Sequence, residues 1–289
     1  MRSTDSAVST EIRCDNVAVL RLDLPGSRVN LLTPKLWRDL QSVLRELKSR
    51  ADLRGLLLAS AKPGSFVAGA DLKWLAQVPA PNDPEAEEFI RLGLTVLDEL
   101  EQFPVPTAAV IEGPAVGGGL ELALACDLRL ASDQPQLRVG LPEVRLGLIP
   151  GWGGTQRLPR IIGLERACDW LITGNLVSAN EAFDAKLINR LVLAGELFEV
   201  AVAEVLAYRP ESIRGRKRAA IPLPERQAFR PAIPSSPPAI REAMLCLLRG
   251  AELPLNEAIA IETAAFLRLI GTDEARLRIQ QFFAQKQQP

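Results

Sequence analysis

Two glutamates, Glu121 and Glu143, stand beside glycines and prolines in a chain of 289 residues that contains no histidine. Histidine is the usual proton carrier near neutral pH, so acid–base chemistry in this chain would fall to carboxylates. Glu121 follows three consecutive glycines in an apolar run, and Glu143 follows Pro142. A carboxyl group among apolar side chains resists ionisation, and the raised pKa suits a general acid near pH 7. Considered alone, each could instead be a surface glutamate, since 24% of the chain is charged.

Three glycine-rich or small-residue turns accompany these glutamates. Glycines 117–119 join an expected strand to an expected helix, where backbone amides can approach and bind an anionic oxygen. Segment 65–72 forms a second turn, and amides from both turns could converge as an oxyanion hole. Segment 149–159 leads into another helix, with Thr155 as its expected cap. The glycines at 117–119 by themselves are equally compatible with a tight strand–helix connection.

The elements that would position these turns follow from the spacing of apolar residues. Strands are predicted at 16–23, 55–61, 107–112 and 127–132. Helices are predicted at 33–49, 85–103 and 118–126. Strands that alternate with helices favour an α/β core with parallel pairing.

Beyond residue 154 the pattern turns helical. Helices are predicted at 154–161, 163–173, 178–184, 195–208, 239–249, 256–269 and 272–286. Their expected caps, with Thr33 for the first helix of the chain, are Ser178, Asn256 and Thr272. Residues 219–238 are proline-rich and indicate a linker, and the basic run 214–218 is typical of a solvated helix end. We therefore divide the chain into a core at 1–210 and a linker with C-terminal helices at 211–289.

Composition narrows the function classes. The chain is 47% apolar with a net charge of −1 and few aromatic residues, which disfavours a nucleic-acid partner. Its four cysteines are scattered and are expected to be reduced thiols, so no metal site is expected. The N-terminal residues resemble no targeting peptide, and no apolar stretch approaches the ~20 residues of a membrane span. We expect a cytoplasmic protein.

Taken in order, the motifs resemble those of the crotonase family, the enoyl-CoA hydratases and isomerases. The matching segments are Phe66-Val-Ala-Gly-Ala-Asp-Leu72, Gly113-Pro-Ala-Val-Gly-Gly-Gly-Leu-Glu-Leu122 and the segment from Gly140 to Leu158. The resemblance covers roughly residues 10–210. It implies an α/β crotonase-like spiral of ββα units with a helical C-terminal region, and acyl-CoA thioesters as substrates. The tail is similar to the segment that follows the hydratase part of multifunctional fatty-acid oxidation enzymes.

The same resemblance implies roles for individual residues. Glu121 and Glu143 match the two catalytic glutamates of hydratases, and the amides of Ala70 and Gly118 would hold the thioester oxygen. Of these two glutamates, we favour Glu143 as the group that activates water. The substrate or CoA would be contacted at the following further positions: Ala68 near the adenine, Gly151 near the water, Asp71, Leu72, Gly117, Trp152 and Arg28.

Two of these positions carry an open alternative. Trp152 stands where many family members have a small residue, and its indole could narrow the acyl pocket or displace the water. Arg28 could contact a CoA phosphate, but a solvated arginine fits its surroundings as well.

The activity expected from this resemblance is hydration of 2-enoyl-CoA, with no cofactor beyond the CoA of the substrate. The alternatives are a Δ3–Δ2-enoyl-CoA isomerase, which needs only one glutamate, and a non-catalytic acyl-CoA-binding subunit. The expected partners are an acyl-CoA thioester, copies of this chain in a trimer or hexamer, and a dehydrogenase.

Overall fold

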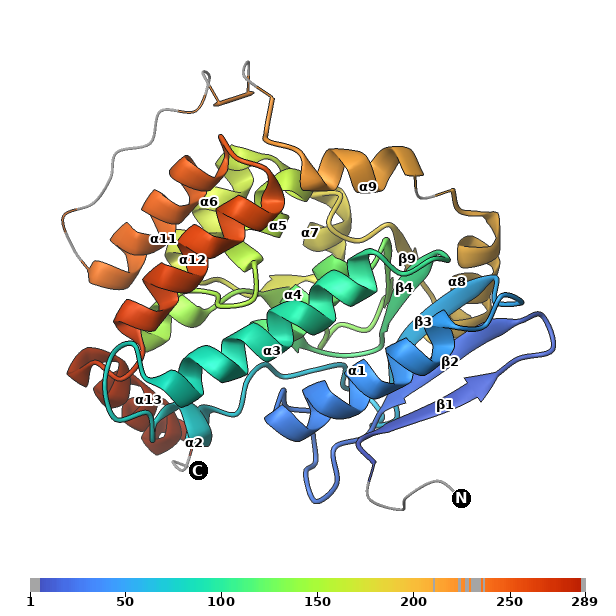
Figure 1. Ribbon diagram of the computed structural model, residues 1–289, viewed down its shortest axis with the longest axis horizontal. Helices are drawn as coiled ribbons and strands as arrows, with labels where there is room; N and C mark the ends of the chain where they lie inside the picture. The colour runs from blue at the N-terminus through green and yellow to red at the C-terminus, as the bar shows by residue number, and fades with distance from the viewer. Residues whose placement is uncertain are drawn as a thin grey trace.

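In the computed structural model, six strands form a sheet that is parallel except at its first pair (Figure 1). The structure describes residues 6–209, 211–222, 225–226, 229, 235 and 237–286. Across the sheet the strands are β1 (Val8–Ile12), β2 (Val17–Leu22), β3 (Gly55–Ser60), β4 (Thr107–Ile111), β6 (Leu128–Ser132) and β9 (Arg190–Val192). A second, three-stranded sheet joins β5 (Ala115–Val116), β7 (Arg138–Gly140) and β8 (Val177–Ser178). The predicted parallel α/β core is confirmed.

Helices cover both faces of the larger sheet. One face of β2, β3, β4 and β6 packs against α8 (Leu197–Ala207). The opposite face packs into the larger core, to which the long helices α1 (Pro34–Lys48) and α3 (Pro84–Glu101) contribute. Because both faces are buried, these strands are continuous apolar runs, as parallel strands usually are.

The remaining helices build the half of the molecule away from β1. They are α2 (Leu72–Leu75), α4 (Gly118–Ala125), the 3₁₀ helix η1 (Glu143–Leu146), α5 (Gly154–Ile162), α6 (Leu164–Thr173), α7 (Ala179–Asp184), α9 (Glu211–Arg218), α11 (Pro238–Gly250), α12 (Leu255–Leu269) and α13 (Asp273–Lys286). Figure 1 shows α11 and α12 beside α5 and α6, with α13 below them next to α2. The predicted linker 219–238 lies largely outside the described residues.

The short strands β1, β5, β7, β8 and β9 were not predicted from the sequence. β5, β7, β8 and β9 span only two or three residues each, too few for a clear alternation, and three of the five residues of β1 are polar. β1 pairs antiparallel with β2 through a register that joins Val8 to Leu22 and Ile12 to Ala18. These strands are held by their neighbours in the sheet rather than by a local pattern.

Three predicted caps are confirmed and two are wrong. Thr33, Ser178 and Thr272 each accept an amide of the first helical turn that follows. Asn256 is no cap, because the buried Leu255 already begins α12 and Pro254 takes the cap position. Thr155 is no cap either, since α5 begins after Gly153, which lies in the left-handed region with φ 94°.

The basic run at 214–218 is not a solvated helix end. Arg214 forms an ion pair with the buried Asp127, and its guanidinium also donates to the Phe103 carbonyl at 2.6 Å. Lys217 Nζ donates to the Cys126 carbonyl at 2.8 Å, and burial lowers its pKa to about 7. These contacts join α9 to the end of α4 and to the residues before β4.

Candidate active site

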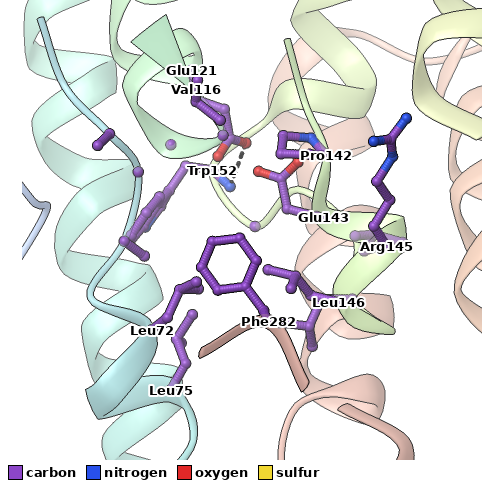
Figure 2. Close-up of a pocket in the computed structure, with 18 of the residues that line it drawn as sticks. Leu72, Leu75, Val116, Glu121, Pro142, Glu143, Arg145, Leu146, Trp152 and Phe282 are labelled. Carbon is purple, nitrogen blue, oxygen red and sulfur yellow. Dashed lines mark hydrogen bonds between the residues drawn. The ribbon is translucent and has the colours of Figure 1, made fainter. Parts of the chain in front are cut away.

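The two glutamates share one cavity of roughly 620 Å³. Its wall comes from the 68–72 loop, the glycine turn, η1, the turn before α5 and helices α2, α3 and α13. In Figure 2 the carboxyl groups of Glu121 and Glu143 point toward each other across the upper part of this cavity. Segments far apart in the sequence therefore converge on these two side chains.

Glu121 is fixed by the backbone of the turn before α5. Its Oε1 accepts the amide of Trp152 at 2.8 Å and the amide of Gly154 at 2.7 Å. The side chain is 1% exposed, so the alternative of a surface glutamate is wrong. Burial raises the pKa of Glu121 well above its usual value, and the negative charges of Glu262 and Glu143 raise it further. Because Oε1 accepts two N–H groups, a proton carried by Glu121 must reside on Oε2.

Glu143 is held less tightly. It begins η1, one residue after Pro142, and faces the glycine turn, where a Cβ added to Gly117 would lie 2.8 Å from its Oε1. No donor among the described residues bonds to its buried Oε2. Burial is the main cause that raises the pKa of Glu143 to about 8. This carboxyl group is therefore available to take or give a proton near neutral pH.

A third buried carboxylate, Glu262 of α12, was missed by the sequence analysis. It is fully buried, and its Oε1 accepts the Gly153 amide at 2.5 Å. Its Oε2 accepts the amide of Thr155 at 2.7 Å and the hydroxyl at 2.5 Å. Burial raises its pKa to about 7. The signal was a single carboxylate within the mostly apolar run 258–266.

The expected oxyanion donors lie at the same cavity. Ala70 and Gly118 both line it. The two turns that carry them pack backbone to backbone, since a Cβ at Gly69 would lie 3.1 Å from the Val116 carbonyl oxygen and 4.0 Å from the Gly118 nitrogen. Glycine at 69 is required by this approach and by its φ of 100°. The arrangement can present two amides to one substrate oxygen.

Most of the expected contact residues line the cavity, and two do not. Ala68, Leu72, Gly117, Gly151 and Trp152 belong to its wall. Asp71 lies outside it and caps α2 by accepting the Lys73 amide at 2.9 Å. Arg28 is exposed and also lies outside the wall. For both residues a role toward CoA stays a prediction.

The Trp152 indole is part of the core as well as of the cavity wall. It is 3% exposed and makes edge-to-face contacts with Trp37 and Phe89, with ring centroids 5.3 and 5.1 Å apart. Its Nε1 donates to the Ile90 carbonyl at 3.2 Å. Space for the ring comes from Gly93 and Gly118, where an added Cβ would lie 2.3 and 2.6 Å from indole atoms. Its own amide is one of the two that hold Glu121.

Helix α13 closes the apolar end of the cavity. This contribution of the C-terminal helix to the site was not predicted from the sequence. Phe282 extends into the space between Leu72, Leu75 and Leu146 in Figure 2. The helix lies against η1, where a Cβ at Gly147 would meet Arg278 Cδ at 3.2 Å. Apolar side chains at this end suit the hydrocarbon part of a substrate.

The described residues contain neither a candidate metal cluster nor a candidate membrane helix. No group of three or more His, Cys, Asp or Glu side chains there could hold a metal ion. The four cysteines are free thiols, and three of them are buried. No described helix is long and apolar enough to span a bilayer.

The family model of enoyl-CoA hydratase/isomerase matches residues 13–214 of this chain. The chain belongs to this family. The predicted crotonase relationship is thereby confirmed, together with the α/β fold and helical C-terminal region that it implied.

Individual relatives agree with this placement. Over 212 residues the chain is 40% identical to the fatty acid oxidation complex subunit alpha of Idiomarina loihiensis, a match that covers 73% of this chain and 30% of that protein. The chain therefore spans less than a third of that relative's length.

Solved structures share the fold over nearly the whole chain. An enoyl-CoA hydratase from Bacillus anthracis is 31% identical with a TM-score of 0.64, and the match covers 98% of both chains. Human mitochondrial delta3-delta2-enoyl-CoA isomerase has a TM-score of 0.74 over 97% of this chain and 98% of that one. At 22% identity this second likeness concerns the fold alone.

Proposed function

We propose that this protein hydrates 2-enoyl-CoA thioesters, with the CoA of the substrate as the only cofactor. The observation that carries the proposal is a pair of glutamates, the buried Glu121 and the half-buried Glu143, which face each other across one cavity beside two candidate amide donors. An isomerase moves one proton from C2 to C4 and can do so with a single carboxylate, whereas addition of water takes a proton from the attacking water and gives a proton to C2, two roles that two carboxyl groups can divide.

The geometry supports the following steps. Glu143 takes a proton from water as the oxygen attacks C3 of the conjugated thioester. Electron density moves to the thioester oxygen, where the amides of Ala70 and Gly118 stabilise the enolate. Glu121 gives a proton from Oε2 to C2, so that H and OH have been added across the double bond. Proton exchange between the two carboxyl groups and solvent restores the starting state.

Isosteric amide variants test these roles. In Glu121→Gln the side-chain oxygen could still accept both backbone amides, and Glu143→Gln keeps the shape of the side chain, so neither substitution removes the fold's main contacts. We expect each variant to lower kcat for crotonyl-CoA by ~10²–10⁴-fold, the usual contribution of a general acid or base. Glu257→Gln, on the exposed face of α12, is the matched control and should leave kcat unchanged.

The same assay separates the alternatives. Crotonyl-CoA and a 3-enoyl-CoA of equal length are offered to the wild-type protein, and products are followed by loss or gain of the conjugated enoyl absorbance. Hydration of crotonyl-CoA supports the proposal. Turnover of the 3-enoyl substrate alone would indicate an isomerase, and CoA-thioester binding without any turnover would indicate a binding subunit; either result overturns the proposal.

A further inference from the structure

Two buried carboxylates, one from α4 and one from α12, hold the same four-residue turn. Glu121 of α4 accepts the amides of Trp152 and Gly154, and Glu262 of α12 accepts those of Gly153 and Thr155. Amides at the start of a helix have no partner within the helix and must be satisfied from outside. Consecutive amides along this turn therefore alternate between the two side chains.

We infer that Glu262 is a positioning residue for the reaction, which fixes the turn at 152–155 and through it the carboxyl group of Glu121. The inference rests on the proposed function of Glu121. Glu262 is fully buried and is not among the residues that line the cavity. Its influence passes through the backbone, because the amides on either side of Gly153 are the ones that bind Glu121 Oε1.

Hydrogen-bond chemistry makes this turn sensitive to Glu262. A carboxylate accepts on both oxygens, as the bonds to Gly153 and Thr155 require. A glutamine side chain here would place an N–H₂ group against one of these N–H donors, and the repelled amide would have to move. A displacement of about 1 Å at a reacting group can lower a rate ~10²-fold.

Among the described residues, charged or titratable groups face Glu262 from α5, α11, α4 and η1. Arg157 of α5 donates to the Trp152 carbonyl at 2.6 Å and pairs with Glu101 of α3, which also binds Arg218 of α9. Cys246 of α11 is a buried thiol whose pKa burial raises above the usual range. Glu121 of α4 and Glu143 of η1 are two more described groups that interact with the charge of Glu262.

Glu262 also acts on its neighbours through its charge. Its negative charge raises the pKa of both Glu121 and Glu143. Removal of that charge must therefore lower both values. A residue with only a structural role would change stability or the amount of folded enzyme, but it would leave the pH at which kcat changes where it was.

The test compares four variants in the full chain, with pH profiles of crotonyl-CoA hydration. We expect Glu262→Gln to lower kcat ~10–100-fold with little change in KM, and to move the limb of the profile near pH 8 to lower pH. Thr155→Val removes the hydroxyl that donates to Glu262 Oε2, a bond that lowers the pKa of Glu262. With Glu262 more often neutral, the limb should move the same way by a smaller amount, and Thr155→Ser should restore it.

The remaining outcomes are decisive. Glu257→Gln on the same helix should move nothing. If Glu262→Gln and Thr155→Val lower the melting temperature while kcat per folded enzyme and the pH profile stay at wild-type values, the positioning role is wrong and the proposed function survives. If the wild-type protein turns over no enoyl-CoA at all, the proposed function and this inference fail together.

Discussion

Glu121 and Glu143 have different surroundings, and the difference decides what each can do. Two backbone amides fix Glu121 Oε1, whereas no described donor reaches Glu143 Oε2. The fixed carboxyl group can deliver a proton from one defined oxygen. The open Oε2 of Glu143 can accept a hydrogen bond or a proton from a small molecule, which supports the proposed choice of Glu143 as the group that activates water.

The pH profile tests this division at the level of single residues. Burial raises the pKa of Glu143 to about 8, so at pH 6 it is mostly protonated and cannot accept a proton from water. We expect kcat/KM for crotonyl-CoA to rise with pH along a limb near pH 8. Because the carboxyl groups interact, the limb belongs to the cluster rather than to one group alone. A limb at pH 4–5, where an exposed glutamate titrates, would contradict the assignment.

Among the elements, the contact between α3 and the turn before α5 depends on a missing side chain. Gly93 lies inside α3, where glycine is ~1 kcal/mol less favourable than alanine. An added Cβ would nevertheless lie 2.3 Å from Trp152 Nε1, closer than real contacts allow. The fit of the indole thus outweighs the helix preference at this position.

We therefore expect Gly93→Ala to destabilise the protein by ~1–3 kcal/mol in urea unfolding, because overpacking outweighs the gain in helix propensity. It should also lower kcat, since the Trp152 amide holds Glu121. Gly215→Ala is the matched control: Gly215 lies in α9, and a Cβ there meets no described atom within 4 Å. It should raise stability by up to ~1 kcal/mol. Equal effects of the two substitutions would refute the overpacking argument.

For the whole molecule, the buried carboxyl groups oppose the usual dependence of stability on pH. The folded-state pKa of Glu143 is raised to about 8 and that of Glu262 to about 7. Between the ordinary glutamate value and these values, the unfolded chain gives up protons that the folded chain keeps. The stability that these groups contribute is present at low pH and is lost as pH rises through this window.

This sign can be measured by the difference between wild type and Glu143→Gln. The amide side chain of the variant does not titrate, so the variant should gain stability relative to wild type as pH rises from about 5 to about 8. The gain can approach ~1.4 kcal/mol per pH unit for one group. Urea unfolding at three pH values checks it. Parallel stability curves for the two proteins would show that Glu143 titrates normally in the fold.

The sequence by itself determined the local features of this protein. Apolar spacing determined the long strands and helices, and hydroxyl side chains next to a helix start determined the caps at Thr33, Ser178 and Thr272. The glycine turn and the two glutamates followed from residue types within a few positions of one another. Each of these features depends on residues that are close together in the chain, so it can be recognised from the sequence alone.

Only the tertiary structure decided how distant segments complete the site. Glu262 binds the turn at 152–155 from more than 100 residues away, α13 brings Phe282 to the apolar end of the cavity, and Trp152 packs into the space at Gly93. The residues around Thr155 predict a helix cap, yet its hydroxyl donates to Glu262 instead. A buried polar group without a hydrogen bond is costly in free energy, so it binds whichever partner the packing places beside it. That partner can be distant in the chain, and the residues next to the polar group in the sequence do not indicate it.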